Sequence, residues 1–587
     1  MPLLSVLTPI PPPGYTRPVR VLNWESGLRR VLILMVCTGM IVAVVLPVGQ
    51  LLVKSLTDAA GRYVGLANFI LYFQTPSLFS SLFHSLWIST LTTIISVGLG
   101  LMYAYALTRS KLPFKALFQG LALVPLFAPT LLNGISLIYL FGKKGLVTTG
   151  FMGLWPGLDI NLYGQTGIVI SEVIYTFPQA VLILTVALST TDARLLEASA
   201  TLGASRFRTL LTVTLPGIKY ALTSAVFVCF ILAFTDFGAP KVVGGWYNVL
   251  ATDIYKQVIG QQNFVMGAVV GVVLLVPTVA AFILDRLGQR RQMAMITAQS
   301  VPPRIEAHGP RDRFFLAFCG IIALTILLFY LTALWASLVK VWPYNLELGL
   351  WHYDFERTGG GGYGAFWNSL RMSLYTAVGG TILTFISAYL IEKSRGLIWV
   401  RRLAYFLSLM PLALPGLVIG LSYIFFFNAA TWETPLGAVP NPFNFLYGTM
   451  GLLALSNIVH FYTVGFLTAT TALKQLDQEF ENVSEALGVS FIKTFQRVTI
   501  PVCFPAILEI FIFYFVNSMA TVSAVIFLYG ADLPVAAVAI ANMDDAGDTA
   551  PACAMSVLII AANALARCLA GLTAGVLARR NRDWTRR

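Results

Sequence analysis

The residues of this 587-residue chain that could do chemistry are polar side chains set singly within long apolar runs. Glu172 and Asp236 are the strongest candidates, because an uncompensated carboxylate is costly in an apolar surrounding. Amides, a hydroxyl and one imidazole occupy similar positions. Seven of these residues are candidates for the wall of a polar path: Asn133, Glu172, Asp236, Asn457, His460, Asn517 and Thr521. The alternative is that they only satisfy one another, or a backbone carbonyl, between packed helices.

No motif for catalysis accompanies these residues. The sequence contains no GxxxxGK[ST] phosphate loop, no HExxH and no GxSxG. Its six cysteines form no CxxC, and of its four histidines only His460 lies well inside an apolar run. We therefore expect no catalytic centre, no cofactor and no metal site.

The composition is that of a polytopic membrane protein. Hydrophobic residues make up 57% of the chain and charged residues 11%, against about 25% charged in ordinary soluble domains. We expect an all-α fold of about 12 transmembrane helices, six in each half. The expected spans are residues 31–53, 82–107, 117–141, 165–190, 215–236, 264–284, 314–339, 366–391, 403–428, 447–472, 501–528 and 552–577.

Two loops inside this apolar chain share one register. The first reads EASATLG from Glu197 to Gly203, and the second reads NVSEALG and ends at Gly488, 285 positions later. Each glycine is followed 13 positions on by a proline, Pro216 or Pro501. Each is also preceded by an aspartate 11 positions earlier. A polar loop repeated in one register predicts a docking surface that is presented twice.

The repeat extends into the spans. Pro125 and Pro129 correspond to Pro411 and Pro415 at nearly the same offset, and we expect these prolines to kink the third and ninth spans. An even number of spans per half makes the repeat parallel. A path between the halves would then follow a pseudo-two-fold axis along the membrane normal.

The placement of Lys and Arg predicts the orientation. With the N-terminus inside, roughly 28 of these residues fall in cytoplasmic segments and eight on the opposite side, so both repeated loops face the cytoplasm. The excess of Lys and Arg in cytoplasmic segments accounts for the net charge of +13, so we expect no nucleic-acid partner. The expected divisions are an N-terminal tail (1–30), a first transmembrane domain (31–285), a linker (286–313), a second transmembrane domain (314–580) and a basic C-terminal tail (581–587).

The repeated loop resembles the EAA loop of MetI-like permease subunits of binding-protein-dependent ABC importers. The first copy fits closely, with Ser199 in place of the third motif residue. The second departs from it, because Asn482 stands where Glu is expected, although Glu481 and Glu485 flank it. The whole chain resembles fused permeases, in which one polypeptide supplies both halves.

The resemblance implies a bacterial inner-membrane protein with both termini in the cytoplasm. Its partners would be two copies of a cytoplasmic ABC ATPase, an external solute-binding protein and membrane lipid. In such permeases the EAA loop forms a coupling helix that sits in a groove of the ATPase. The resemblance gives this role to Glu197, Ala198, Gly203, Leu215, Pro216, Glu481, Ala486, Gly488 and Pro501.

The substrate is the least determined expectation. The segment 236–256 resembles fused permeases for 2-aminoethylphosphonate, and we expect it, with the acidic segment 532–548, to form an external dock for the binding protein. Ferric iron is the main alternative, and thiamine or another small solute is a further one. An ion-coupled secondary transporter would also show twelve spans and a parallel repeat, but it does not require the duplicated loops. A membrane-embedded enzyme would need a polar cluster that the sequence does not offer.

Overall fold

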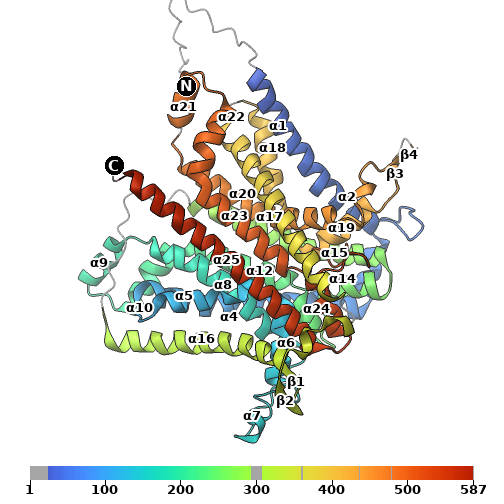
Figure 1. Ribbon diagram of the computed structural model, residues 1–587, viewed down its shortest axis with the longest axis vertical. Coiled ribbons are helices and arrows are strands. Elements are labelled where there is room, and N and C mark those ends of the chain that lie inside the picture. Colours follow the sequence, from blue (N-terminus) through green and yellow to red (C-terminus); the bar gives the residue numbers. More distant parts are fainter. Residues whose placement is uncertain are drawn as a thin grey trace, which may run out of the picture.

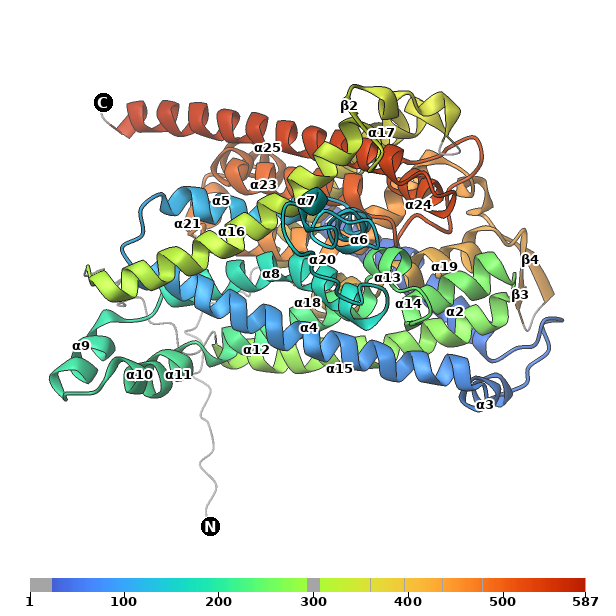
Figure 2. The same cartoon turned by 90° about the horizontal axis from the view of Figure 1, so that it is seen from below.

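A computed structural model describes residues 24–292 and 307–585, apart from residues 359, 360, 395, 435, 436 and 478. Most of the expected N-terminal tail, the middle of the linker and the last two residues of the C-terminal tail therefore lie outside the described residues. The described part is built from helices, with two small antiparallel hairpins at its surface (Figures 1 and 2).

The first half contains fifteen α-helices among the described residues. They are α1 (Trp24–Met40), α2 (Leu46–Ser55), α3 (Ala67–Gln74), α4 (Pro76–Arg109), α5 (Lys115–Leu123), α6 (Thr130–Phe141), α7 (Gly150–Gly153), α8 (Gln165–Ser189), α9 (Ala193–Thr201), α10 (Arg206–Thr209), α11 (Leu215–Gly217), α12 (Lys219–Thr235), α13 (Gly238–Val243), α14 (Leu250–Tyr255) and α15 (Phe264–Gln292).

The second half contains ten α-helices and both hairpins in the part that the structure describes. Its elements are α16 (Gly309–Leu338), β1 (Val339–Val341), β2 (Asn345–Leu348), α17 (Gly362–Lys393), α18 (Ile398–Leu409), α19 (Gly416–Phe427), β3 (Thr431–Thr434), β4 (Gly437–Pro440), α20 (Met450–Gln475), α21 (Glu479–Ala486), α22 (Phe491–Thr494), α23 (Ile500–Ala520), α24 (Ala536–Asp545) and α25 (Thr549–Thr585).

The expectation of about twelve membrane spans is confirmed. Nine helical segments among the described residues are long and apolar enough to cross a membrane, and the number reaches twelve if each of three bent pairs is one span. The first segment begins at Gly27, a few residues before the expected start at residue 31. The last, Thr549–Gly575, continues as helix to Thr585, into the segment that we expected to be a tail.

Proline bends two spans at equivalent places, as the sequence predicted. In the third span, α5 and α6 meet at 104°, and in the ninth, α18 and α19 meet at 112°. Pro125 and Pro411 each open a short 3-10 turn, and Pro129 and Pro415 each directly precede the next helix. Proline has no N–H to continue a helix, and its fixed φ suits the start of a new one.

The first span of each half packs against the other half. Helices α1 and α2 contact α17, α18 and α19, whereas α16 contacts α4, α5 and α6 (Figure 1). Two hydrogen bonds mark these contacts: the Tyr423 hydroxyl donates to the carbonyl of Ala43 at 2.9 Å, and the Tyr330 hydroxyl donates to Asn133 at 2.9 Å. One apolar core therefore runs through both halves.

The repeat persists at the level of single hydrogen bonds. The Ser85 hydroxyl accepts from the backbone N–H of Leu250 at 2.8 Å, and the Ser369 hydroxyl accepts from that of Ala536 at 2.7 Å. These pairs are related by offsets of 284 and 286 positions. In both halves the same hydrogen bond thus fixes the external segment to the second span.

The segments after the fifth and eleventh spans differ in detail from the expectation. The eleventh span ends at Ala520, not at residue 528, and Thr521 adopts an extended conformation. Within the segment 236–256, expected as a dock, residues 237–244 are largely buried where α13 packs against α6, whereas Trp246 is fully exposed. Close packing makes this possible: a Cβ on Gly134 would come within 2.8 Å of Val242, so only glycine lets α13 approach. The chain folds back into the bundle because this segment is mostly apolar and small.

Candidate coupling surface and buried polar residues

The first repeated loop folds as a chain of short capped helices. Asp192 accepts a hydrogen bond from the N–H of Arg194 at the start of α9, and Ser205 caps α10 in the same way. Between them, Gly203 adopts φ +73°, a conformation that favours glycine. A π-helical turn, Leu210–Thr214, then leads to Pro216.

The second loop repeats each of these features. Asp477 accepts from the N–H of Glu479, Ser490 caps α22, Gly488 adopts φ +66°, and a π-helical turn over Phe495–Thr499 precedes Pro501. Offsets of 285 positions therefore relate caps, glycines and π turns alike. In both loops nothing lies within 4 Å of a Cβ built on the glycine. The glycine is thus required by the turn, and space is left beside it.

Both loops present apolar side chains that the described chain leaves uncovered. Leu202 is 86% exposed and its equivalent Leu487 is 73% exposed, and Leu195 and Phe480 form a second exposed pair. The two loops lie at the same end of the molecule as the C-terminus, apart from each other in both views (Figures 1 and 2). Matched apolar patches on polar, membrane-external loops are typical of protein–protein contacts.

The predicted coupling residues occupy different environments. Glu197, Ala198, Gly203 and Pro216 are exposed, and Leu215 is half-buried. Their counterparts in the second loop, Ala486, Gly488 and Pro501, are also exposed.

Glu481 differs from these, because it turns inward. Its carboxylate lies 3.2 Å from the Nζ of Lys393, which also donates to the carbonyl of Leu476 at 3.1 Å. Lys393 therefore connects the end of α17 to α21 and to the residue that follows α20. In the first half Arg109 holds Leu188 and Thr191 instead, and Leu196 stands where Glu481 is. Glu481 is therefore an internal anchor in this conformation.

The structure brings Glu172 and Asp236 together in the first half. Glu172 is fully buried in α8 beside Asp236 at the end of α12, and neither of its carboxyl oxygens has a hydrogen-bond partner among the described residues. Asp236 also accepts hydrogen bonds from the N–H of Ala239, at 2.9 Å, and from the hydroxyl of Thr130. The pair thus joins α8, the α12–α13 corner and the start of α6.

The equivalent position in the second half carries a neutral contact. Asn457 is fully buried in α20 and donates to the hydroxyl of Ser518 at 2.9 Å. His460, Asn517 and Thr521 are all half-buried, and Asn517 donates to the carbonyl of Phe513 one turn earlier. Asn457 and its neighbours do not form a carboxyl pair, so the two halves differ in their ionisable groups at this depth.

Asn133 lies apart from these residues, in the contact between the halves. It is buried in α6 and accepts the hydrogen bond from Tyr330 of α16. Tyr330 is a residue that the sequence did not single out, because no local pattern indicates which helix of the other half packs beside α6. Among the described residues, no group of three His, Cys, Asp or Glu could hold a metal ion.

A second set of contacts missed from the sequence joins the halves at the end opposite the coupling loops. Lys241 of α13 forms an ion pair with Asp545 of α24, and the hydroxyls of Tyr139 and Thr549 lie 3.0 Å apart. The indole of Trp342 donates to the carbonyl of Lys144 at 3.0 Å. The sequence shows that the segment 532–548 is acidic, but no local pattern pairs Asp545 with Lys241.

Comparison with known proteins agrees with this architecture. The family model described as "Binding-protein-dependent transport system inner membrane component" matches twice, over residues 96–293 and 368–574. Each match includes one repeated loop.

Several relatives span most of the chain. The ferric transport system permease protein FbpB of Actinobacillus pleuropneumoniae is 27% identical over 81% of this chain and 68% of its own length. A putative ferric transport permease, FbpB 1 of Haemophilus influenzae, is 28% identical over 76% of this chain and 70% of its own length. The molybdenum permease ModB of Escherichia coli is 30% identical over 26% of this chain and 67% of its own length. None of these three names a phosphonate, so they give no support to 2-aminoethylphosphonate.

Proposed function

This chain belongs to the family of inner-membrane components of binding-protein-dependent transport systems, and we propose that it carries ferric iron across that membrane. It is the multi-pass permease subunit of an ABC importer with two fused halves. Such a subunit is not itself an enzyme, and it works with a separate ATPase and a solute-binding protein.

The coupling role of the loops rests on the matched exposed leucines. We assign the docking of one ATPase copy to each loop, through Glu197, Ala198, Gly203, Leu215 and Pro216 in the first. In the second loop Ala486, Gly488 and Pro501 take this part, while Glu481 anchors the helix from within. Two loops of equal shape call for two copies of one partner. Because ATP is cytoplasmic, this end of the molecule, with both termini, would face the cytoplasm.

Truncation of the exposed leucines tests the docking surface. We expect Leu202→Ala combined with Leu487→Ala to reduce co-purification of the ATPase by at least tenfold, because buried leucines contribute about 1.5–3 kcal/mol each to an interface. Leu154→Ala is the matched control, since Leu154 is 87% exposed and lies in the segment after α7, away from both loops. Equal ATPase recovery from the double variant and the control would exclude these loops as the dock.

The substrate assignment is carried by the ferric transport relatives, which align with both halves of the chain. Hard oxygen ligands suit Fe³⁺, and Glu172 and Asp236 supply carboxylates within the membrane-spanning region. We propose that these two residues, with Asn133, Asn457, His460, Asn517 and Thr521, border the path in at least one state of the transport cycle.

Uptake in cells tests the substrate independently of docking. Cells lacking this chain should lose uptake of radiolabelled ferric iron, and the wild-type chain should restore it while Leu202→Ala with Leu487→Ala should not. Labelled 2-aminoethylphosphonate is measured in parallel. Loss of aminophosphonate uptake with unchanged iron uptake would overturn the ferric assignment and leave the permease architecture standing.

A further inference from the structure

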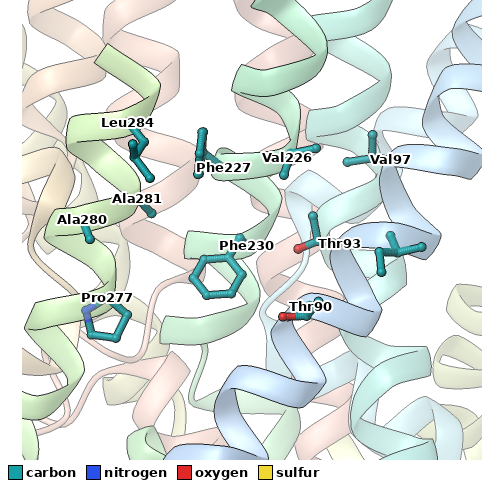
Figure 3. A pocket seen from close by; sticks show the side chains of 11 residues that line it. Thr90, Thr93, Val97, Val226, Phe227, Phe230, Pro277, Ala280, Ala281 and Leu284 are labelled. Atoms are coloured by element: carbon teal, nitrogen blue, oxygen red, sulfur yellow. The ribbon is translucent and has the colours of Figure 1, made fainter. Parts of the chain in front are cut away.

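A groove opens on the outer face of the first half, between α4, α12 and α15 (Figure 3). Its volume is about 430 Å³. Buried Thr93 and Ala281 form part of its floor, whereas Ile94 and Leu284 on its rim are more than half exposed. All three helices belong to membrane-spanning segments, so the groove faces the bilayer.

The walls of this groove offer an occupant almost no hydrogen bonds. The hydroxyl of Thr90 donates to the carbonyl of Leu86 at 2.7 Å, and that of Thr93 donates to the carbonyl of Ser89 at 2.6 Å. Both hydroxyl protons are therefore already used within α4. The remaining lining side chains are aliphatic or aromatic, including Phe227 and Phe230 (Figure 3). Burying a polar ligand here would leave its polar groups without partners, so the occupant must be apolar.

A positive charge precedes the groove along α12, seven positions before its lining residue Val226. Lys219 is the first residue of α12, is exposed, and lies on the side of the coupling loop. Eleven residues separate it from Phe230, which is roughly 16 Å along a helix. Half of the hydrocarbon core of a bilayer is about 15 Å thick. The acid Asp285 of α15 is buried, and its negative charge acts on Arg286.

We propose that this groove binds one acyl chain of an anionic phospholipid from the leaflet on the coupling-loop side, with the lipid phosphate at Lys219. The apolar walls select the chain, and the lysine selects the headgroup. The site is independent of the transported solute. The site lies on α12, which runs from the first coupling loop to Asp236. The bound acyl chain therefore contacts the helix that connects the ATPase-docking loop with the buried residues Glu172 and Asp236.

The site is specific to the first half. At the positions equivalent to Thr90 and Val226, the second half has Leu374 and Phe511, which are both larger. The equivalent surface of the second half therefore serves as a comparison for the groove in the first half. We expect one such lipid per polypeptide.

Native mass spectrometry of the permease–ATPase complex tests the site. The complex is delipidated and then titrated with 1-palmitoyl-2-oleoyl-phosphatidylglycerol or with the matching phosphatidylcholine. Wild type should retain one phosphatidylglycerol that Ala280→Trp loses, because Ala280 lines the groove and is itself exposed. The control is Val276→Trp, one turn away on α15, where the side chain is 65% exposed and does not line the groove.

The headgroup is tested separately with Lys219→Gln. This variant should reduce the preference for phosphatidylglycerol over phosphatidylcholine about fivefold, the effect of one basic residue near an anionic surface, while keeping the chain bound. Equal lipid retention by Ala280→Trp and Val276→Trp would overturn the site. An unchanged lipid preference in Lys219→Gln would overturn the headgroup contact, and retention of a peptide mass instead of a lipid mass would show that a protein helix occupies the groove.

Discussion

At the scale of single residues, the two coupling loops share a backbone but differ in how they are anchored. Gly203 and Gly488 adopt the same positive φ, and both are free of neighbours at Cβ. Among the described residues, the second loop has an acid, Glu481, bound to a lysine at the end of a membrane helix, and the first loop shows no such pair. This acid stands one position before Asn482, where the family pattern has Glu. The departure from the motif therefore coincides with a different internal contact.

Lys393 is the residue whose loss should release the second loop. We expect Lys393→Met to destabilise the attachment of α21 by about 1–3 kcal/mol, because it leaves Glu481 and the carbonyl of Leu476 without their partner. Hydrogen exchange of the amides of α21 measures this loss directly. Lys474→Met is the control, since its 3.9 Å contact with Glu392 is exposed and should contribute little. Equal exchange rates of the α21 amides in both variants would show that the contact between Lys393 and Glu481 does not hold α21 in place.

At the scale of elements, the sequence predicted the membrane spans and their proline bends but not the segments beyond them. Pro129 and Pro415 act locally, so their effect could be read from the chain. The burial of α13 depends on Gly134 accepting a neighbour a hundred positions away, which no local pattern shows. For the same reason the sequence did not indicate that Glu172 lies beside Asp236.

The external helix α14 should make stability depend on pH. Burial raises the pKa of Asp253 to about 6, despite a hydrogen bond from Ser81 and the positive charge of Lys256. The folded protein therefore binds this proton more tightly than the unfolded chain does. We expect the contribution of Asp253 to stability to be fully present below about pH 4 and to be lost as the pH rises through about 6.

Thermal unfolding between pH 4.5 and 7.5 measures this dependence. Asp253→Asn should flatten the pH profile in this window. Asp58→Asn is the control, because the backbone hydrogen bond from Arg62 lowers the pKa of Asp58, and any pH dependence that it contributes lies below the window. A slope that persists in Asp253→Asn would assign the dependence to other groups, of which Asp544 is the first candidate, because burial raises its pKa to about 6 as well.

At the scale of the whole molecule, the halves pack against each other, but the two coupling loops do not meet. Lys241–Asp545 and Tyr139–Thr549 connect them at the end opposite the coupling loops, whereas the loops themselves lie apart (Figures 1 and 2). This is the arrangement of a permease that is closed at the end opposite the coupling loops. The parallel repeat could be predicted from offsets in the sequence. Which end of the permease is closed could not be predicted, because it depends on contacts between the two halves.

The ion pair Lys241–Asp545 should hold the external end closed. Cys553 of α25 is fully buried, and its thiol lies near Tyr139 and Asp544, close to this closure. We expect Lys241→Met to increase the rate at which an impermeant maleimide labels Cys553 about two- to fivefold, because a partly exposed ion pair contributes roughly 0.5–1 kcal/mol. Mass spectrometry distinguishes Cys553 from the exposed Cys568.

A matched control separates closure from a general effect of lost charge. Lys340→Met breaks an ion pair with Glu347 at 3.0 Å, which lies within one external hairpin and does not join the halves. Its labelling rate should equal that of the wild type. Binding of the ATPase with ATP should raise labelling of Cys553 in the wild type, because drawing the coupling loops together opens the opposite end. If Lys241→Met and Lys340→Met label Cys553 equally, the closure is carried by the apolar contacts around Tyr139 and not by charge.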